Sequence, residues 1–350
     1  MSANRLSIVI LTLVLVLAMV LTVVPGCAPK EEPVPSHETV NIQLYGGSLG
    51  GISYFYSFGL ADLINKNHPW LRATAVETTG SIENVKTIID QPEMKTVIFP
   101  WSASTVYDIL KLGVGPFKDY GPYKDLKVVC KGQWLFGLIF TLDPDIKTFS
   151  DFAGKKLNIG LAGSAESRDM EAFIKAAGLE GKIEVTQMGR VDARDALIDG
   201  LIDGLISNLM GSGVGGKEWS AFPADAELLA SKKVYAVGFE PELVQKQIDL
   251  TKARLIQAVV PAKALEGFPE KETPSYAMPL GWYADIAMDE EIVQEVLRIQ
   301  DEHASKFVEY SAQLKTVTPD MLGNMPYPEE DFHPGAVKYF KENGIKIGID

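Results

Sequence analysis

The chain has 350 residues, 46% of them hydrophobic and 23% charged, so it is large enough for two folded domains and too apolar to be disordered as a whole. Its formal net charge of −13 argues against binding to nucleic acid, which requires a basic surface. Two cysteines and four scattered histidines exclude a zinc cluster and a disulfide framework.

Residues 1–26 have the pattern of a secretory signal peptide. Arg5 is their one charged side chain, and a nearly continuous apolar segment runs from Leu6 to Val24. The following Val24–Cys27 resembles a lipobox, and in bacterial lipoproteins its cysteine is diacylated and becomes the first mature residue. We therefore expect lipidation at Cys27 and a globular part outside the cytoplasmic membrane, in the periplasm or on the outer face. An uncleaved membrane anchor stays open as an alternative, because the apolar segment is nearly long enough to span a bilayer.

Residues 27–39 are predicted to form a tether that links this end to the folded part. The segment is rich in proline and charge, and its maximum reach is on the order of 40 Å. If Cys27 carries lipid, Cys130 has no disulfide partner. Because Cys130 ends the apolar run that begins at Leu126, we expect it to be a buried, unreactive thiol.

The first part of the mature chain alternates strands and helices, which is typical of an α/β sheet. In chain order we expect a strand at 40–45, a glycine-rich loop at 46–51, a helix up to Asn65, a strand at 73–77, a turn at 78–80, a helix capped by Ser81, a strand at 96–99, a loop at 101–104 and a helix to Leu112. Glu83 falls in the first turn of its helix, where the dipole favours an anion.

From residue 136 the alternation starts again, which indicates a second α/β block. The expected elements are a strand at 136–142, a short helix and turn at 149–156, a strand at 157–160, a helix capped by Ser164 and ending at Ala177, a strand at 185–188, a helix at 193–201 and a strand at 205–207. After about residue 250, Ile292, Val296, Ile299 and Phe307 predict one face of a long amphipathic helix.

Glycine, serine and threonine gather at the junctions where predicted strands end and helices begin. Ligands of open α/β sheets bind at this edge, where helix N-termini present free N–H groups to anions and glycines allow close approach. Each pair alone is also explained as a turn with a helix cap, but four such junctions together favour a binding cleft. The candidate ligand-binding residues are Gly47, Ser48, Ser53, Tyr54, Thr79, Gly80, Ser81, Trp101, Ser102, Ser164, Arg168, Arg190 and Asn208.

Motifs for catalysis are missing from the sequence. The loop at 46–51 matches neither a dinucleotide fingerprint nor a phosphate loop, and no Gly-x-Ser-x-Gly or HExxH segment is present. We therefore expect a binding protein that is not an enzyme and uses no cofactor or metal.

The mature chain resembles the TAXI-type solute receptors of TRAP transporters. The resemblance rests on five segments, of which Thr78–Asn84 and Phe332–Gly344 are the most specific; the others are Tyr45–Asn65, Asp151–Ser164 and Asp199–Gly204. It implies a type II periplasmic-binding-protein fold with two α/β lobes and a ligand cleft between them. It also implies delivery of a small organic anion or amino acid to integral-membrane TRAP subunits, with no nucleic acid as partner, and a structural role for His333.

With this fold, we expect lobe 1 to comprise 40–135 and 245–350, and lobe 2 to comprise 136–244. A hinge between them is expected near 132–137 and 238–250. Closure of the lobes would bury the solute.

Departures from the family pattern bear on the solute. Glu166 stands in the first turn of its helix, where relatives often have Gly-Ser-Gly-Thr; facing the cleft it favours an amine, and facing solvent, the orientation that we favour, it only complements the dipole. Arg168 and Arg190 are candidates for gripping a carboxylate, or are surface arginines. Tyr54 and Trp101 cover an apolar part of the solute, or simply pack.

Two other functions remain open on the sequence alone. An ABC-type or sensor-coupled binding lipoprotein would have the same fold, and neighbouring genes would distinguish it. A surface enzyme that acts on the bound molecule through Ser and Asp residues is a third possibility.

Overall fold

The computed structural model describes residues 37–349 except 48, 50, 163, 320 and 321. Residues 1–38 and 39–350 form separate units, and the account below concerns the second. The predicted signal peptide and Cys27 lie outside the described residues. Among the helices that are described, none is both long and apolar enough to cross a membrane.

The strands of the described residues join in one sheet, with the order β2-β1-β3-β11-β4-β7-β5-β6; β10 pairs with β11, β8 with β7 and β9 with β4. The strands are β1 (Val40–Tyr45), β2 (Leu71–Val76), β3 (Ile98–Ala103), β4 (Leu126–Thr141), β5 (Lys156–Asn158), β6 (Glu184–Thr186), β7 (Gly204–Gly211), β8 (Trp219–Ala221), β9 (Tyr235–Val237), β10 (Ile256–Val260) and β11 (Thr273–Asp285). Pairing is parallel within β1–β3 and within β5–β7, and antiparallel around β4 and β11.

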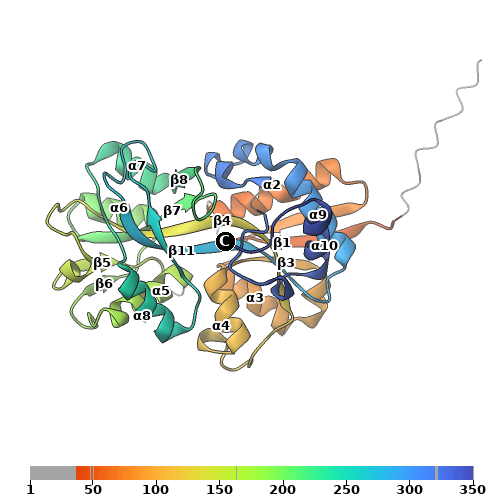
Figure 1. The fold of residues 1–350 in the computed structure, drawn as a ribbon, viewed down its shortest axis with the longest axis horizontal. Coiled ribbons are helices and arrows are strands. Elements are labelled where there is room, and N and C mark those ends of the chain that lie inside the picture. Colours follow the sequence, from red (N-terminus) through yellow and green to blue (C-terminus); the bar gives the residue numbers. More distant parts are fainter. Residues whose placement is uncertain (1–36, 48, 50, 163, 320–321, 350) are drawn as a thin grey trace, which may run out of the picture. The chain divides into compact units, whose positions relative to one another are not determined.

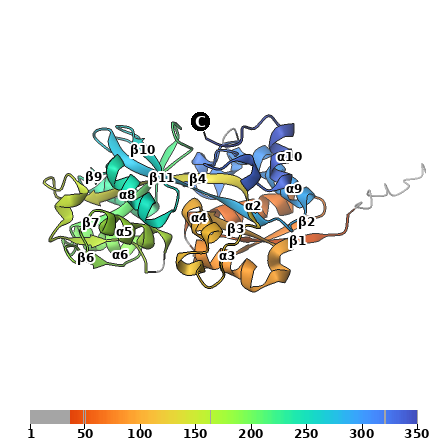
Figure 2. The ribbon, with the colours of Figure 1, turned by 60° about the horizontal axis from the view of Figure 1, so that its bottom comes forward.

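Helices cover the sheet on both sides of the two long strands. They are α2 (Ile52–Asn67), α3 (Ser81–Asp90), α4 (Ser104–Leu112), α5 (Ala165–Ala176), α6 (Arg190–Ile198), α7 (Pro223–Ser231), α8 (Pro241–Thr251), α9 (Glu290–Glu302) and α10 (Pro334–Glu342). Figures 1 and 2 show two α/β lobes, one with β1–β3, α2–α4, α9 and α10, the other with β5–β9 and α5–α8. The predicted two-lobe α/β fold is confirmed, while the boundaries at residues 136 and 245 stay predictions.

Strands β4 and β11 run antiparallel through both lobes (Figure 1). Because nearly all of β4 is buried, its sequence is a long apolar run and not an alternating one. The two glycines of β4 lie where aromatic rings pack directly against its backbone. A Cβ on Gly132 would stand 1.9 Å from the Trp101 ring, and one on Gly137 would stand 2.1 Å from the Tyr276 ring. Trp101 is 3% exposed and packs edge-to-face on Tyr56 and Trp282, with ring centroids 5.0 and 5.1 Å away.

Several sequence predictions are confirmed with small shifts in their bounds. The strand at 40–45 is β1, the helix up to Asn65 is α2, and the helix after Ser164 is α5. The Ser164 hydroxyl accepts a hydrogen bond from the N–H of Ser167 at 3.0 Å, as expected of a cap. Cys130 is buried as predicted, and burial raises the pKa of its thiol to about 12, which disfavours the reactive thiolate.

Three expectations about local structure are wrong. Residues 101–103 continue β3 instead of forming a loop, because they pair with β11, which places Trp282 opposite Trp101. Ser81 is the first residue of α3 rather than its cap; Gly80 holds the cap position, and the Ser81 hydroxyl accepts from the N–H of Ala103 at 3.2 Å. The second hinge segment, expected near 238–250, is mostly helix α8, and the long strand that pairs with β4 is β11.

The contact between Gly132 and Trp101 makes a prediction about stability. Gly132→Ala should lower the free energy of unfolding by about 1–3 kcal/mol, because the new methyl group must displace the Trp101 ring from a packed aromatic cluster. Urea unfolding followed by tryptophan fluorescence measures this change. Gly189→Ala is the control, since its Cβ meets nothing nearer than 3.9 Å, and an equal loss in both variants would contradict the packing argument.

Candidate functional site

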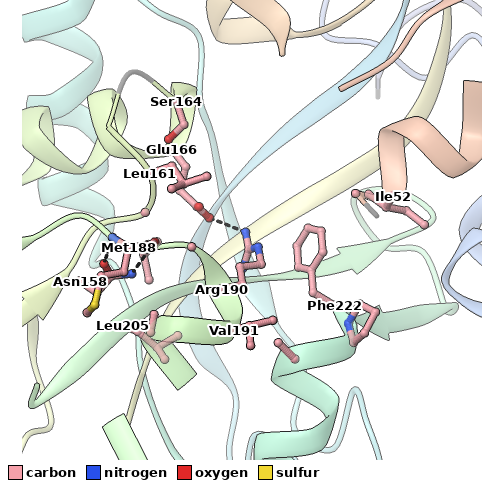
Figure 3. A pocket seen from close by; sticks show the side chains of 17 residues that line it. Ile52, Asn158, Leu161, Ser164, Glu166, Met188, Arg190, Val191, Leu205 and Phe222 are labelled. Atoms are coloured by element: carbon pink, nitrogen blue, oxygen red, sulfur yellow. Dashed lines mark hydrogen bonds and ion pairs between the residues drawn. The ribbon is translucent and has the colours of Figure 1, made fainter. Parts of the chain in front are cut away.

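A cavity of about 330 Å³ lies where the starts of four helices meet. Gly51 and Ile52 at the start of α2 form one side, and residues of the other lobe form the rest (Figure 3). That lobe contributes the residues at the starts of α5, α6 and α7, namely Ser164, Glu166, Gly189, Arg190, Val191, Phe222, Pro223 and Ala224. The site therefore lies at strand-to-helix junctions, where ligands of α/β sheets bind.

Three charged side chains form an ion cluster in the wall of the cavity. Arg190 donates from Nη2 to Glu166 Oε1 at 2.6 Å and from Nη1 to Asp225 Oδ2 at 3.2 Å. Its guanidinium carbon lies 3.8 Å from the centre of the Phe222 ring. With both carboxyls ionised the cluster carries a net charge of −1, and its arginine is held on two sides.

Neutral side chains complete the cluster from strand β7. Asn208 Nδ2 donates to Glu166 Oε1 at 2.6 Å, and the Ser207 hydroxyl donates to Asp225 Oδ2 at 2.6 Å. Glu166 thus faces the cavity, as Figure 3 shows, and the expectation that it faces solvent is wrong. Its helix starts beside the cavity, so a first-turn side chain is directed toward Arg190.

Burial governs the ionisation of the two carboxyls. It raises the pKa of Glu166 and of Asp225 above the ordinary carboxyl values, although Arg190 and the hydrogen bonds lower both. Asp225 is only 1% exposed, so it depends on Arg190 for compensation of its charge.

The rest of the cavity wall is largely apolar. Its apolar lining residues are Ile52 from the β1–β3 lobe and Leu161, Met188, Leu205 and Phe222 from the other lobe (Figure 3). A small molecule with a polar end and an apolar body fits such a wall.

The predicted site residues of the β1–β3 lobe gather around one amide but lie outside the lining of this cavity. Asn84 Nδ2 donates to the carbonyl oxygens of Tyr45, Gly46 and Trp101 at 2.8–3.1 Å, which joins the three predicted junctions. Gly80 accepts from the backbone N–H of Asn84 at 3.0 Å, and a Cβ on Gly47 would stand 2.5 Å from the Ser53 hydroxyl. Tyr54 lines a separate groove with Phe58, and Ser48 is outside the described residues.

Two of the predicted residues are enclosed in the protein. Trp101 and Ser102 are buried in β3, and Trp101 packs against Tyr56 and Trp282, which agrees with the second of the two alternatives left open for it. The pairing of β3 with β11 is the physical reason for this burial. Their role in binding stays a prediction.

The two predicted arginines have different partners. Arg190 lines the cavity, whereas Arg168 donates to Asp169 at 2.6 Å and to the Thr105 hydroxyl at 2.9 Å. Because Thr105 belongs to α4 and Arg168 to α5, this contact joins the two lobes.

Phe222, Ile52 and Asp225 belong to the site but are not among the predicted residues. Phe222 precedes Pro223, and proline is frequent at the first position of a helix, so the sequence carries a signal for a junction there. Asp225 has no such signal, because only the fold brings it to Arg190. No group of residues suited to hold a metal ion occurs in the described part of the chain.

Removal of Arg190 tests the ion cluster. Arg190→Met should lower the free energy of unfolding by about 3 kcal/mol at pH 8, since it leaves the buried Asp225 and the half-buried Glu166 carboxylates without a cation. The loss should be smaller at pH 5. Carboxyls with a raised pKa bind protons more readily in the folded than in the unfolded state, so stability falls as the pH rises above the ordinary carboxyl range.

Urea unfolding at both pH values measures this difference. Arg194→Met is the matched control on the same helix, because Arg194 pairs with the exposed Asp195 and Glu227 and should contribute less than about 1 kcal/mol. Equal losses in the two variants would mean that the cluster is not a buried ion network.

Comparison with known proteins gives the family of this chain. Solved structures similar to it include the periplasmic aliphatic sulphonate binding protein SsuA from Escherichia coli, 18% identical, with 88% of this chain and 94% of that chain covered and a TM-score of 0.45. MatC from Rhodopseudomonas palustris with bound malate is 14% identical, with 87% and 96% covered and a TM-score of 0.47. A TctC solute binding protein from Polaromonas is 15% identical, with 81% and 88% covered and a TM-score of 0.46. The sequence pattern of the NMT1-like family matches residues 44–344, and the chain belongs to that family.

Proposed function

We propose that this protein is an extracytoplasmic solute receptor that binds a small organic carboxylate or amino acid and delivers it to the membrane subunits of a transporter. The observation that carries the proposal is the cavity between the two lobes, walled by four helix starts, an ion cluster and apolar side chains. Helix N-termini bind anionic groups through free N–H groups, and the apolar wall accepts a carbon skeleton. The cavity thus offers groups for both ends of a small organic solute, and we propose that the protein binds this solute without altering it.

We further propose that the transporter is of the TRAP type and that the receptor is of the TAXI type. The two most specific segments of the resemblance have defined structural roles, which supports this assignment. Asn84, at the end of the first segment, ties the junctions together, and buried His333 in the second caps α10 by accepting from the N–H of Gly335 at 3.2 Å. Burial lowers the pKa of His333, which suits the neutral ring that such a cap requires.

The proposal predicts that the purified full-length protein retains a small molecule. Native mass spectrometry should show one small adduct, and adding the same compound should raise the melting temperature, because binding to the folded state adds stability as RT ln(1 + [L]/Kd). The compound should be recovered unchanged after long incubation.

A pair of variants places this molecule in the cavity. Leu161→Trp should abolish the adduct, since Leu161 lines the cavity and is exposed, so a larger side chain fills the space without disturbing the core. Leu201→Trp is the control, because Leu201 is similarly exposed, 63% against 57% for Leu161, and does not line the cavity. An adduct that survives in Leu161→Trp would contradict binding at this site.

The proposed membrane anchor gives a separate prediction. Cys27→Ala should move the protein from the membrane fraction to the soluble fraction and abolish incorporation of labelled fatty acid, because Cys27 is the predicted lipid acceptor. Cys130→Ala serves as the control, since Cys130 is buried and should not affect either result. Fatty-acid labelling that persists in Cys27→Ala would refute the lipoprotein assignment.

A further inference from the structure

We propose that the solute is an aliphatic zwitterion, such as an apolar α-amino acid, and that Glu166 binds its ammonium group. This inference rests on the proposed function and names the class of solute. It distinguishes an amine-bearing solute from a plain carboxylate and from a dicarboxylic amino acid.

The first step is the free oxygen of Glu166. Its Oε1 accepts from both Arg190 and Asn208 at 2.6 Å, and no hydrogen bond to Oε2 occurs within the described part of the chain. Gly160 leaves room for this oxygen, since a Cβ there would stand 2.8 Å from Oε2. The buried Oδ1 of Asn208 also lacks a hydrogen-bond donor among the described residues. Glu166 Oε2 is therefore an acceptor without a donor on a residue that lines the cavity, and an ammonium group supplies the missing donor.

The second step is the charge of the cavity wall. With both carboxyls ionised, Glu166, Asp225 and Arg190 together carry −1, and both Nη atoms of the arginine already donate to carboxylates. A carboxylate without an amine would enter a negative site and compete with two fixed anions for one cation. An ammonium group neutralises the excess charge instead.

The third step concerns the carboxylate end of the zwitterion. Helices α2, α6 and α7 begin at the cavity and have no side-chain cap, whereas α5 is capped by Ser164. Among the described residues, no side chain accepts a hydrogen bond from the first-turn N–H groups of α2 or α6, although the Asp192 carboxylate lies 3.9 Å from the Cβ position of Gly189 at the start of α6. These N–H groups suit one carboxylate, which the helix dipoles favour.

The fourth step concerns the body of the solute. The Phe222 ring lies between Arg190 and Ile52 of α2, and Leu161 adds an apolar side chain beside Glu166 (Figure 3). A second carboxylate placed against these apolar side chains would lose hydrogen bonds to water, which is costly. An aliphatic side chain has no hydrogen bonds to water to lose. The cavity should therefore bind leucine and exclude glutamate.

A matched series of probes tests the inference on the full-length protein, dialysed to remove any bound molecule. Isothermal titration calorimetry compares L-leucine with 4-methylpentanoate, which lacks the amine, with 3-methylbutylamine, which lacks the carboxylate, and with L-glutamate. L-alanine, L-valine and L-phenylalanine cover other sizes. We expect an apolar amino acid to bind at least 10-fold more tightly than its amine-free analogue and than glutamate.

The variant Glu166→Gln keeps the shape of the side chain and removes its charge. It should weaken binding of the amino acid at least 10-fold. It should also reduce the difference in affinity between leucine and 4-methylpentanoate. Glu227→Gln is the matched control, because Glu227 is exposed and lies outside the cavity lining.

The outcomes separate this inference from the proposed function. If 4-methylpentanoate binds as tightly as L-leucine, or if Glu166→Gln binds L-leucine with unchanged affinity, the ammonium assignment is wrong. The proposed receptor function is not affected by either result. If no amino acid, carboxylate or amine binds and the purified protein carries no adduct, the proposed function fails together with the inference.

Discussion

The antiparallel pairing of β4 with β11 is the constraint on which the rest of the structure depends. These strands pair from Leu126 opposite Asp285 to Phe136 opposite Ala277, and both are buried along most of their length. Rings pack directly against the ladder, Trp101 at Gly132 and Tyr276 at Gly137, where any side chain would collide with them. Each lobe is thus attached to the same two strands, and this attachment brings the starts of α2, α5, α6 and α7 to one cavity.

Inside this frame the ion cluster sets the chemistry of the cavity. Arg190 compensates Asp225, which is buried, and Glu166, which faces the cavity. Because two carboxylates hold one guanidinium, the arginine is fixed in place, and the remaining charge and the free Glu166 oxygen are available to a solute. The same contacts that stabilise the fold therefore define what the cavity can recognise.

Local sequence patterns predict the elements whose partners are close in the chain. Ser164 as a helix cap and the strand at 40–45 are examples, since capping and alternation are local properties. The two-lobe α/β fold follows from the alternation of strands and helices together with the family resemblance.

Features that depend on distant partners could not be predicted in this way. Residues 101–103 look like a loop until β11, about 180 residues later, pairs with them. β11 itself contains Pro274, Pro279 and Gly281, which disfavour a strand locally. The orientation of Glu166 depends on Arg190 and Asn208, which other elements supply.

A crystal structure of the full-length protein grown with L-leucine tests the central claim most directly. The account predicts one small molecule in the cavity, with its nitrogen about 3 Å from Glu166 Oε2 and its carboxylate at the start of α2 or α6. A molecule bound elsewhere, or one whose carboxylate displaces Glu166 from Arg190, would contradict it.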